Sequence, residues 1–296
     1  MDDTRELANR FEAQRDRLRG VAYRMLGSVS EAEDAVQEAW LRLQRADTSE
    51  VANLAGWLTT VVGRVCLDLL RTRVARREEF VGAQLPDPIV RPAEQAGPET
   101  EALLADSVGL ALLIVLDALD PAERLAFVLH DMFALPFEEI AGIVGRSTAA
   151  TRQLASRARR RVQGSAPTPA ADLARQRAVV NAFFAAAHDG DLDALVAVLD
   201  PDVVLRAEDA GTAAGTSRLV RGAKNVASRA MAFAVTADPG LVVGPVLVNG
   251  TAGLMASRDG TPQVVFAVTV ASGKIAGITI YADPVRLRRL SLPEPR

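Results

Sequence analysis

Residues 119–162 read LDPAERLAFVLHDMFALPFEEIAGIVGRSTAATRQLASRARRRV, and this stretch carries the start and stop signals of three successive helices. Pro121 follows an aspartate and suits the first position of a helix, and Pro136 marks the start of a second helix. Gly145 suits the tight turn that ends this second helix, and Ser147 can cap the third. Two helices joined by so short a turn predict a helix-turn-helix.

The third helix has two chemically different sides. Its inner side is predicted to hold Thr151, Leu154, Ala155, Ala158 and Val162. The outward side starts at Thr148 and carries Ala149, Arg152, Gln153, Ser156 and Arg160, with Arg157 at its edge. Arginine and glutamine can each make paired hydrogen bonds to a base edge in the major groove. Arg146, Arg159 and Arg161 suit phosphates, which position a helix without reading sequence. The alternative is a basic surface helix of a bundle.

Two segments are strongly basic in a chain whose net charge is −3. Residues 144–164 contain six arginines and no acid, and residues 64–77 contain five arginines against one aspartate. Basic helices in an acidic chain indicate selective contact with DNA. The single cysteine, Cys66, excludes an internal disulfide and a cysteine-clustered zinc site, and two histidines argue against a histidine-rich one, so no metal or cofactor is predicted.

Proline-rich stretches divide the chain into a multidomain plan. Two helical domains, residues 1–80 and 106–163, are separated by a proline-rich linker at 81–105. A second linker at 164–171 precedes an α+β domain at 172–290 and a tail at 291–296. The chain has no apolar run of the length that spans a bilayer and no secretory signal, so the expected location is the cytoplasm, away from any membrane.

The helix predicted to run to about Arg45 begins at a capping box formed by Ser30 and Glu33. Its inner side is predicted to hold Ala35, Val36, Ala39, Trp40 and Leu43. Its other side holds Asp34, Gln37, Glu38 and Leu41. Such a face suits a partner helix that carries arginines around an apolar spot, although a solvated polar face is the alternative.

A further helix is predicted over residues 56–73. Its inner face comprises Trp57, Leu58, Val61, Val62, Val65, Cys66 and Leu69. The opposite side comprises Thr60, Arg64, Leu67 and Arg71, continued by Arg73, Arg76 and Arg77. These arginines suit a helix end that lies across phosphates, while complementing the helix dipole is the alternative.

Residues 32–43 (AEDAVQEAWLRL) and 56–71 (GWLTTVVGRVCLDLLR) resemble region 2 of the extracytoplasmic-function (ECF) sigma factors. The resemblance implies that the face of Asp34, Gln37, Glu38 and Leu41 binds the clamp coiled coil of the RNA polymerase β′ subunit. It also implies that the second helix and the loop before it open and read the −10 promoter element, with Arg64 facing the melted strand and Asn53 as a loop candidate.

Residues 119–162 resemble sigma region 4, which binds the −35 element and the flap of the β subunit. Arg152 and Arg157 fall where that family places −35 contacts. His130 has a structural explanation as a partly buried side chain of the preceding helix.

The C-terminal segment has helices up to about Leu199, followed by period-two stretches that predict strands. These stretches lie at 202–207, 241–248, 251–257, 263–270 and 274–281, with a hairpin turn between the last two. The run from residue 173 resembles SnoaL-like domains, which implies a curved sheet cupped by helices. Five residues are candidates for acid–base chemistry in such a cone: His188, Asp202, Glu208, Asp209 and Tyr281. None forms a pair that catalysis needs, so no enzyme is predicted.

The domain order resembles the ECF subgroup that carries a fused SnoaL-like extension, which implies control in cis without a separate anti-sigma factor. Residues 84–88 (QLPDP) resemble a Leu-Pro-acid-Pro element of this subgroup, whereas residues 282–287 (ADPVRL) depart from its Asn-Pro-Asp-Lys-Leu element. The predicted partners are core RNA polymerase and promoter DNA. The alternatives are a stand-alone, ligand-sensing helix-turn-helix regulator and a cone-fold isomerase or hydrolase tethered to a DNA-binding module.

Overall fold

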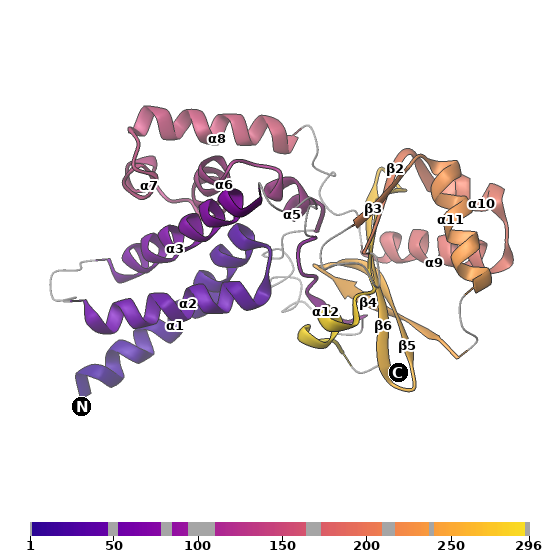
Figure 1. Cartoon of the computed structure of the whole chain (residues 1–296), viewed down its shortest axis with the longest axis horizontal. Coiled ribbons are helices and arrows are strands. Elements are labelled where there is room, and N and C mark those ends of the chain that lie inside the picture. Colours follow the sequence, from indigo (N-terminus) through magenta and orange to yellow (C-terminus); the bar gives the residue numbers. More distant parts are fainter. Residues whose placement is uncertain are drawn as a thin grey trace. The chain divides into compact units, whose positions relative to one another are not determined.

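The computed structural model describes residues 2–46, 53–77, 85–93, 110–163, 173–208, 217–236 and 240–293. The chain divides into two compact units, each with its own hydrophobic core (Figure 1). The first unit consists of Met1–Val81 and Leu113–Ser165. The second consists of Gly82–Leu112 and Ala166–Arg296.

Three long helices form the N-terminal half of the first unit: α1 (Asp2–Leu26), α2 (Val29–Arg45) and α3 (Leu54–Arg77). They pack on one another through apolar side chains such as Phe11, Val36 and Leu58, all of which are buried. The predicted inner side of α2 is confirmed, except that Trp40 stays partly exposed and contacts Phe11, with 5.0 Å between the ring centroids.

The predicted capping box at the start of α2 is wrong. The N-cap is Ser28, whose hydroxyl accepts a hydrogen bond from the backbone N–H of Glu31 at 3.5 Å. Gly27, with φ of 70°, ends α1, so α2 starts at once and uses the Ser-x-x-Glu spacing that begins two residues before the predicted one. Glu33 instead pairs with Arg19, with 3.4 Å between nitrogen and oxygen.

The rest of the first unit contains α6 (Pro121–Phe127), the π-helical turn Val128–Met132, α7 (Phe137–Val144) and α8 (Thr148–Gln163). Before them comes α5 (Leu110–Asp117), which belongs to this unit from Leu113 onward. The predicted local signals are confirmed. The Asp120 carboxylate accepts from the Ala122 N–H at 2.9 Å, and the Ser147 hydroxyl accepts from the Ala150 N–H at 3.2 Å. Gly145 is left-handed, with φ of 72°, and therefore allows the sharp turn between α7 and α8.

A seven-stranded sheet forms the second unit, in the order β1-β4-β5-β6-β7-β2-β3. Its strands are β1 (Val90–Pro92), β2 (Leu199–Glu208), β3 (Ser217–Arg221), β4 (Val242–Val248), β5 (Thr251–Arg258), β6 (Thr261–Ala271) and β7 (Lys274–Tyr281). All pairs are antiparallel except β2 with β7. The predicted hairpin between β6 and β7 is confirmed, because Ser272 and Gly273 both have positive φ.

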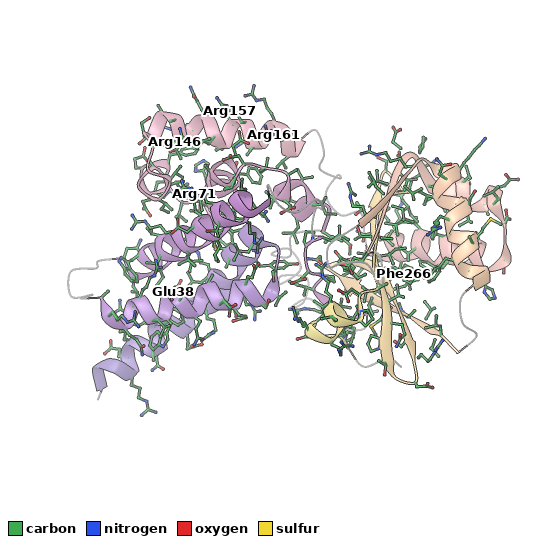
Figure 2. All side chains as sticks on the ribbon, viewed as in Figure 1. Glu38, Arg71, Arg146, Arg157, Arg161 and Phe266 are labelled. Atoms are coloured by element: carbon green, nitrogen blue, oxygen red, sulfur yellow. The ribbon has the colours of Figure 1, made fainter. Side chains whose placement is uncertain are left out.

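One face of the sheet packs against α9 (Leu173–Asp189), α10 (Leu192–Val198) and α11 (Ala223–Thr236). The Phe266 ring lies in this core, 5.3 Å from the ring of Phe184 and 5.8 Å from that of Phe233 (Figure 2). The sequence reading missed β1, β3, α11 and the short helix α12 (Pro284–Arg289). Strand β1 gave no local signal, because it is three residues long and ends in a proline.

Candidate nucleic-acid interface

Helix α8 turns the predicted basic stripe toward solvent. Thr151, Ala155 and Ala158 are 0% exposed and face the interior of the unit. The opposite side is exposed at Ala149, Arg152, Gln153, Ser156, Arg157 and Arg160, and Thr148 is half-buried at the helix start. Figure 2 locates Arg146, Arg157 and Arg161 along α8 and the turn before it. The stripe therefore offers amide, hydroxyl and guanidinium donors on one accessible face.

Neighbouring acids hold several of these arginines in place. Arg152 pairs with Glu138 of α7 at 3.1 Å, and its guanidinium carbon lies 5.7 Å from the centre of the Phe137 ring. Arg159 pairs with Asp131 at 2.5 Å, and Arg161 pairs with Glu123 at 2.8 Å. These ion pairs, and the contact of Arg152 with the Phe137 ring, restrict the conformations of three arginine side chains.

Two arginines of the stripe, Arg157 and Arg160, have no ion-pair partner within the described ranges of the chain.

His130 has the structural role that the sequence suggested. Its Nδ1 lies 2.9 Å from the Leu135 carbonyl oxygen, and its ring stacks on that of Phe137 with 3.7 Å between centroids.

The residues predicted to contact the −10 element lie on helix α3 and on the residue before it. The Asn53 side chain caps α3, because its Oδ1 accepts from the Gly56 N–H at 3.0 Å. Arg64 and Arg71 are exposed and Thr60 is half-buried. Arg73 forms an ion pair with Glu31 and donates to the Leu26 carbonyl oxygen at 2.9 Å. The Arg76 side chain lies outside the described residues.

The predicted faces of α3 need two corrections. Leu67, predicted to face outward, is 1% exposed, whereas Leu69, predicted to face inward, is 37% exposed. The reason is that α3 packs on two sides: against α1 and α2, and against α6 and α7. A helix buried on two sides has no single apolar stripe for periodicity to find.

The residues predicted to bind the polymerase lie on α2. Asp34, Gln37 and Leu41 are exposed, and Glu38 is half-buried and pairs with Arg42 at 2.8 Å. Leu41 is 36% exposed and stands among these acceptor groups. The structure thus places an apolar side chain and acidic and amide groups on one accessible side of the helix.

In the second unit, the sheet domain holds the segment Leu85–Pro92, which lies in the sequence between the two helical parts of the first unit. Strand β1 pairs with β4, and the buried Tyr281 hydroxyl donates to the Pro86 carbonyl oxygen at 2.9 Å. Arg286 of α12 pairs with Asp87 at 2.8 Å, and it also contacts Glu208 and the Leu85 carbonyl oxygen. The two sequence elements singled out at 84–88 and 282–287 therefore meet at Arg286.

Burial opposes the charged forms of both Arg286 and Glu208. Its side chain is 16% exposed, and burial opposes its charge, but the Glu208 and Asp87 carboxylates outweigh that effect and raise the pKa of Arg286. Burial also raises the pKa of Glu208, and Arg286 offsets this only in part. The cluster is a fixed, charged anchor for the linker.

The five candidate acid–base residues do not converge on a site. His188 and Asp202 are exposed, and Glu208 and Tyr281 take part in the linker anchor. Asp209 lies outside the described residues. Among the residues that the structure describes, no cluster of side chains has the composition of a metal site. Within the same ranges, no helix has the length and apolarity needed to cross a membrane.

Comparisons with known proteins agree with this architecture. Residues 10–76 match Sigma-70 region 2, and residues 110–162 match Sigma-70, region 4. The chain is 40% identical over 303 residues to the ECF RNA polymerase sigma factor SigJ of Mycobacterium tuberculosis, covering 97% of this chain and 95% of the relative. It is 36% identical over 277 residues to the probable ECF sigma factor SigI of the same species, covering 94% and 93%.

A crystal structure of M. tuberculosis SigJ has the same fold, with a TM-score of 0.76 and 38% identity over 97% of this chain and 100% of that one. The predicted architecture is thereby confirmed: two helical sigma regions followed by an α+β domain with a mixed sheet. The chain belongs to the extracytoplasmic-function sigma factors, which bind core RNA polymerase and direct transcription initiation at promoters.

Proposed function

We propose that α8 reads the −35 element, that α3 and Asn53 contact the −10 element, and that the α2 face binds the β′ clamp. Region 4 also binds the β flap. The observation that carries the proposal is the exposed stripe of α8, where residues suited to base edges occupy one accessible side of a capped helix. The chain itself supplies no catalysis in this scheme, and it works in the cytoplasm on DNA held by the polymerase.

Run-off transcription with purified core RNA polymerase, on DNA upstream of the protein's own gene, tests this function. A specific start that depends on the protein, with footprints at two elements upstream, is the expected result. A two-fold-symmetric footprint that forms without polymerase would instead favour a stand-alone regulator.

Within region 4, Arg152→Ala should weaken −35 recognition by about 1–3 kcal/mol, because a bidentate contact to a base is lost. Competition binding with matched and mismatched −35 sequences measures the effect. Arg159→Ala is the matched control, since Arg159 is predicted to contact phosphate and should weaken binding to all sequences alike. An Arg152→Ala loss that is equal on every sequence would contradict base reading.

We also propose that the C-terminal domain regulates initiation in cis. The segment from Leu85 to Pro92 lies in the chain between regions 2 and 4, and it is fastened to the domain through Arg286, Tyr281 and β4. The domain therefore holds the middle of the segment that joins region 2 to region 4 in the sequence. This tether gives the domain influence over the spacing of the two regions without a separate anti-sigma factor.

A further inference from the structure

Helix α7 places an acid beside the arginine that is proposed above to read a base. Glu138 and Glu139 both lie in the first turn of α7, and both side chains are exposed. Glu138 reaches α8, because its Oε1 accepts a hydrogen bond from Nη2 of Arg152 at 3.1 Å. Glu139 pairs with no cation in the described part of the chain. Two adjacent acids of one helical turn therefore differ in whether they contact Arg152.

An aromatic ring contacts the same guanidinium. The guanidinium carbon of Arg152 lies 5.7 Å from the centre of the Phe137 ring. The Phe137 ring in turn stacks on that of His130, with 3.7 Å between centroids, and Nδ1 of His130 lies 2.9 Å from the Leu135 carbonyl oxygen. One acidic and one aromatic side chain of α7, the latter fixed by a second ring, thus limit where Arg152 can point.

The hydrogen bond to Glu138 leaves Arg152 enough donors to read a base. A guanidinium has five N–H donors, and Glu138 occupies one of them. A paired contact to N7 and O6 of guanine needs two more. The Arg152 side chain is also 60% exposed, so these donors are accessible. The number of donors therefore allows Arg152 to bond a base edge without leaving Glu138.

A phosphate at the same place would meet the Glu138 charge. A phosphate bound to Arg152 would put a second anion close to the Glu138 carboxylate, whereas the edge of a guanine is neutral. An exposed ion pair contributes little in water. Contact with DNA displaces water, however, and charges interact more strongly where water is excluded. Glu138 therefore favours a base contact over a phosphate contact at Arg152.

The other two ion pairs of α8 differ from this one. Arg159 and Arg161 lie outside the exposed stripe, and they pair with Asp131 and Glu123. The side chains of these two acids are 23% and 7% exposed, whereas that of Glu138 is 64% exposed. Of the three acids, Glu138 is thus the one that pairs with a member of the stripe and is open to an approaching duplex.

We propose that Glu138 is a specificity-determining positioning residue, which holds Arg152 for a base edge and keeps it from backbone phosphates. The inference rests on the proposed reading of a −35 base pair by Arg152. Without the Glu138 charge, Arg152 is free to bind phosphates wherever α8 meets DNA, and such contacts carry no sequence information. Loss of the acid should therefore strengthen binding to wrong sequences more than binding to the right one.

The test uses Glu138→Gln in the full-length chain assembled with core RNA polymerase. Glutamine keeps the size of the side chain and removes its charge. The matched control is Glu139→Gln, which removes the same charge from the same turn of α7 and leaves the contact with Arg152 intact. A weaker interaction with the helix dipole, or a general loss of repulsion toward DNA, would appear in both variants.

The measurement is competition binding with promoter DNA in which each −35 base pair is replaced in turn. Arg152→Ala identifies the base pair that Arg152 reads, as the position where the preference for the original base is lost. At that position Glu138→Gln should reduce the preference about 2- to 5-fold, the range expected for an exposed ion pair. At the other positions, and at every position in Glu139→Gln, the preference should equal that of wild type.

A double-mutant cycle shows whether Glu138 acts through Arg152. In the Arg152→Ala background, Glu138→Gln should change the preference at that base pair no more than Glu139→Gln does. An unchanged preference in Glu138→Gln, an equal change at all positions, or the same change without Arg152 would overturn the positioning role. Failure of the proposed −35 reading is distinguishable, because Arg152→Ala would then alter no base preference, and that result would overturn both.

Discussion

Leu41→Arg should lower the affinity for core RNA polymerase by at least about 100-fold and abolish transcription. Leu41 is 36% exposed at the centre of the proposed clamp-binding face. Burying a leucine side chain contributes about 1.5–3 kcal/mol, and the substitution also places a cation where the partner helix is expected to carry arginines. Binding of labelled protein to purified core polymerase measures the effect.

Leu69→Arg on α3 is the matched control for this experiment. Leu69 has nearly the same exposure, 37%, and lies outside the proposed polymerase and DNA contacts. The added charge is identical, so a nonspecific effect of surface arginine would appear in both variants. Wild-type affinity in Leu41→Arg, or an equal loss in Leu69→Arg, would remove the α2 face from the polymerase interface.

Arg286→Met should destabilise the second unit by about 3 kcal/mol and release the linker. The substitution leaves the Asp87 and Glu208 carboxylates partly buried without their cation, and breaking a buried pair in this way costs several kcal/mol. Both tryptophans, Trp40 and Trp57, belong to the first unit, so tryptophan fluorescence follows that unit alone. Urea unfolding followed by circular dichroism should shift while the fluorescence transition does not.

Arg288→Met provides the control, because Arg288 lies on the same helix and is exposed. Unchanged unfolding in Arg286→Met would show that the anchor does not stabilise the domain. In run-off assays, the proposed regulation in cis requires that Arg286→Met change the transcript yield while Arg288→Met does not. Equal yields from both variants and wild type would contradict it.

The stability loss in Arg286→Met should shrink as the pH is lowered. Burial raises the pKa of Glu208 above its ordinary value of about 4.3, and loss of Arg286 should raise it further. A carboxyl whose pKa is higher in the folded state binds protons more tightly there, so lowering the pH through that pKa favours folding. The difference in unfolding free energy between variant and wild type should therefore narrow from pH 7 to about pH 5, and a constant difference would contradict the role of Glu208.

Local signals accounted for the helix-turn-helix. Pro121, Gly145 and Ser147 each act within a few residues of their own position, and all three do in the structure what the sequence predicts. The faces of α2 and α8 were also predictable, because each helix buries one side and exposes the other. The strands from β4 to β7 follow the period-two segments for the same reason.

The sequence by itself thus determined the order of domains, the outward stripe of α8 and the face of α2. Only the tertiary structure decided that Leu67 is buried, that Arg124 reaches the Arg24 carbonyl oxygen 100 residues away, and that Arg286 meets Asp87 across 199 residues. Periodicity and capping record the chemistry of neighbours along the chain. Contacts between distant segments depend on how separately formed elements pack, and a single sequence carries no local pattern for them.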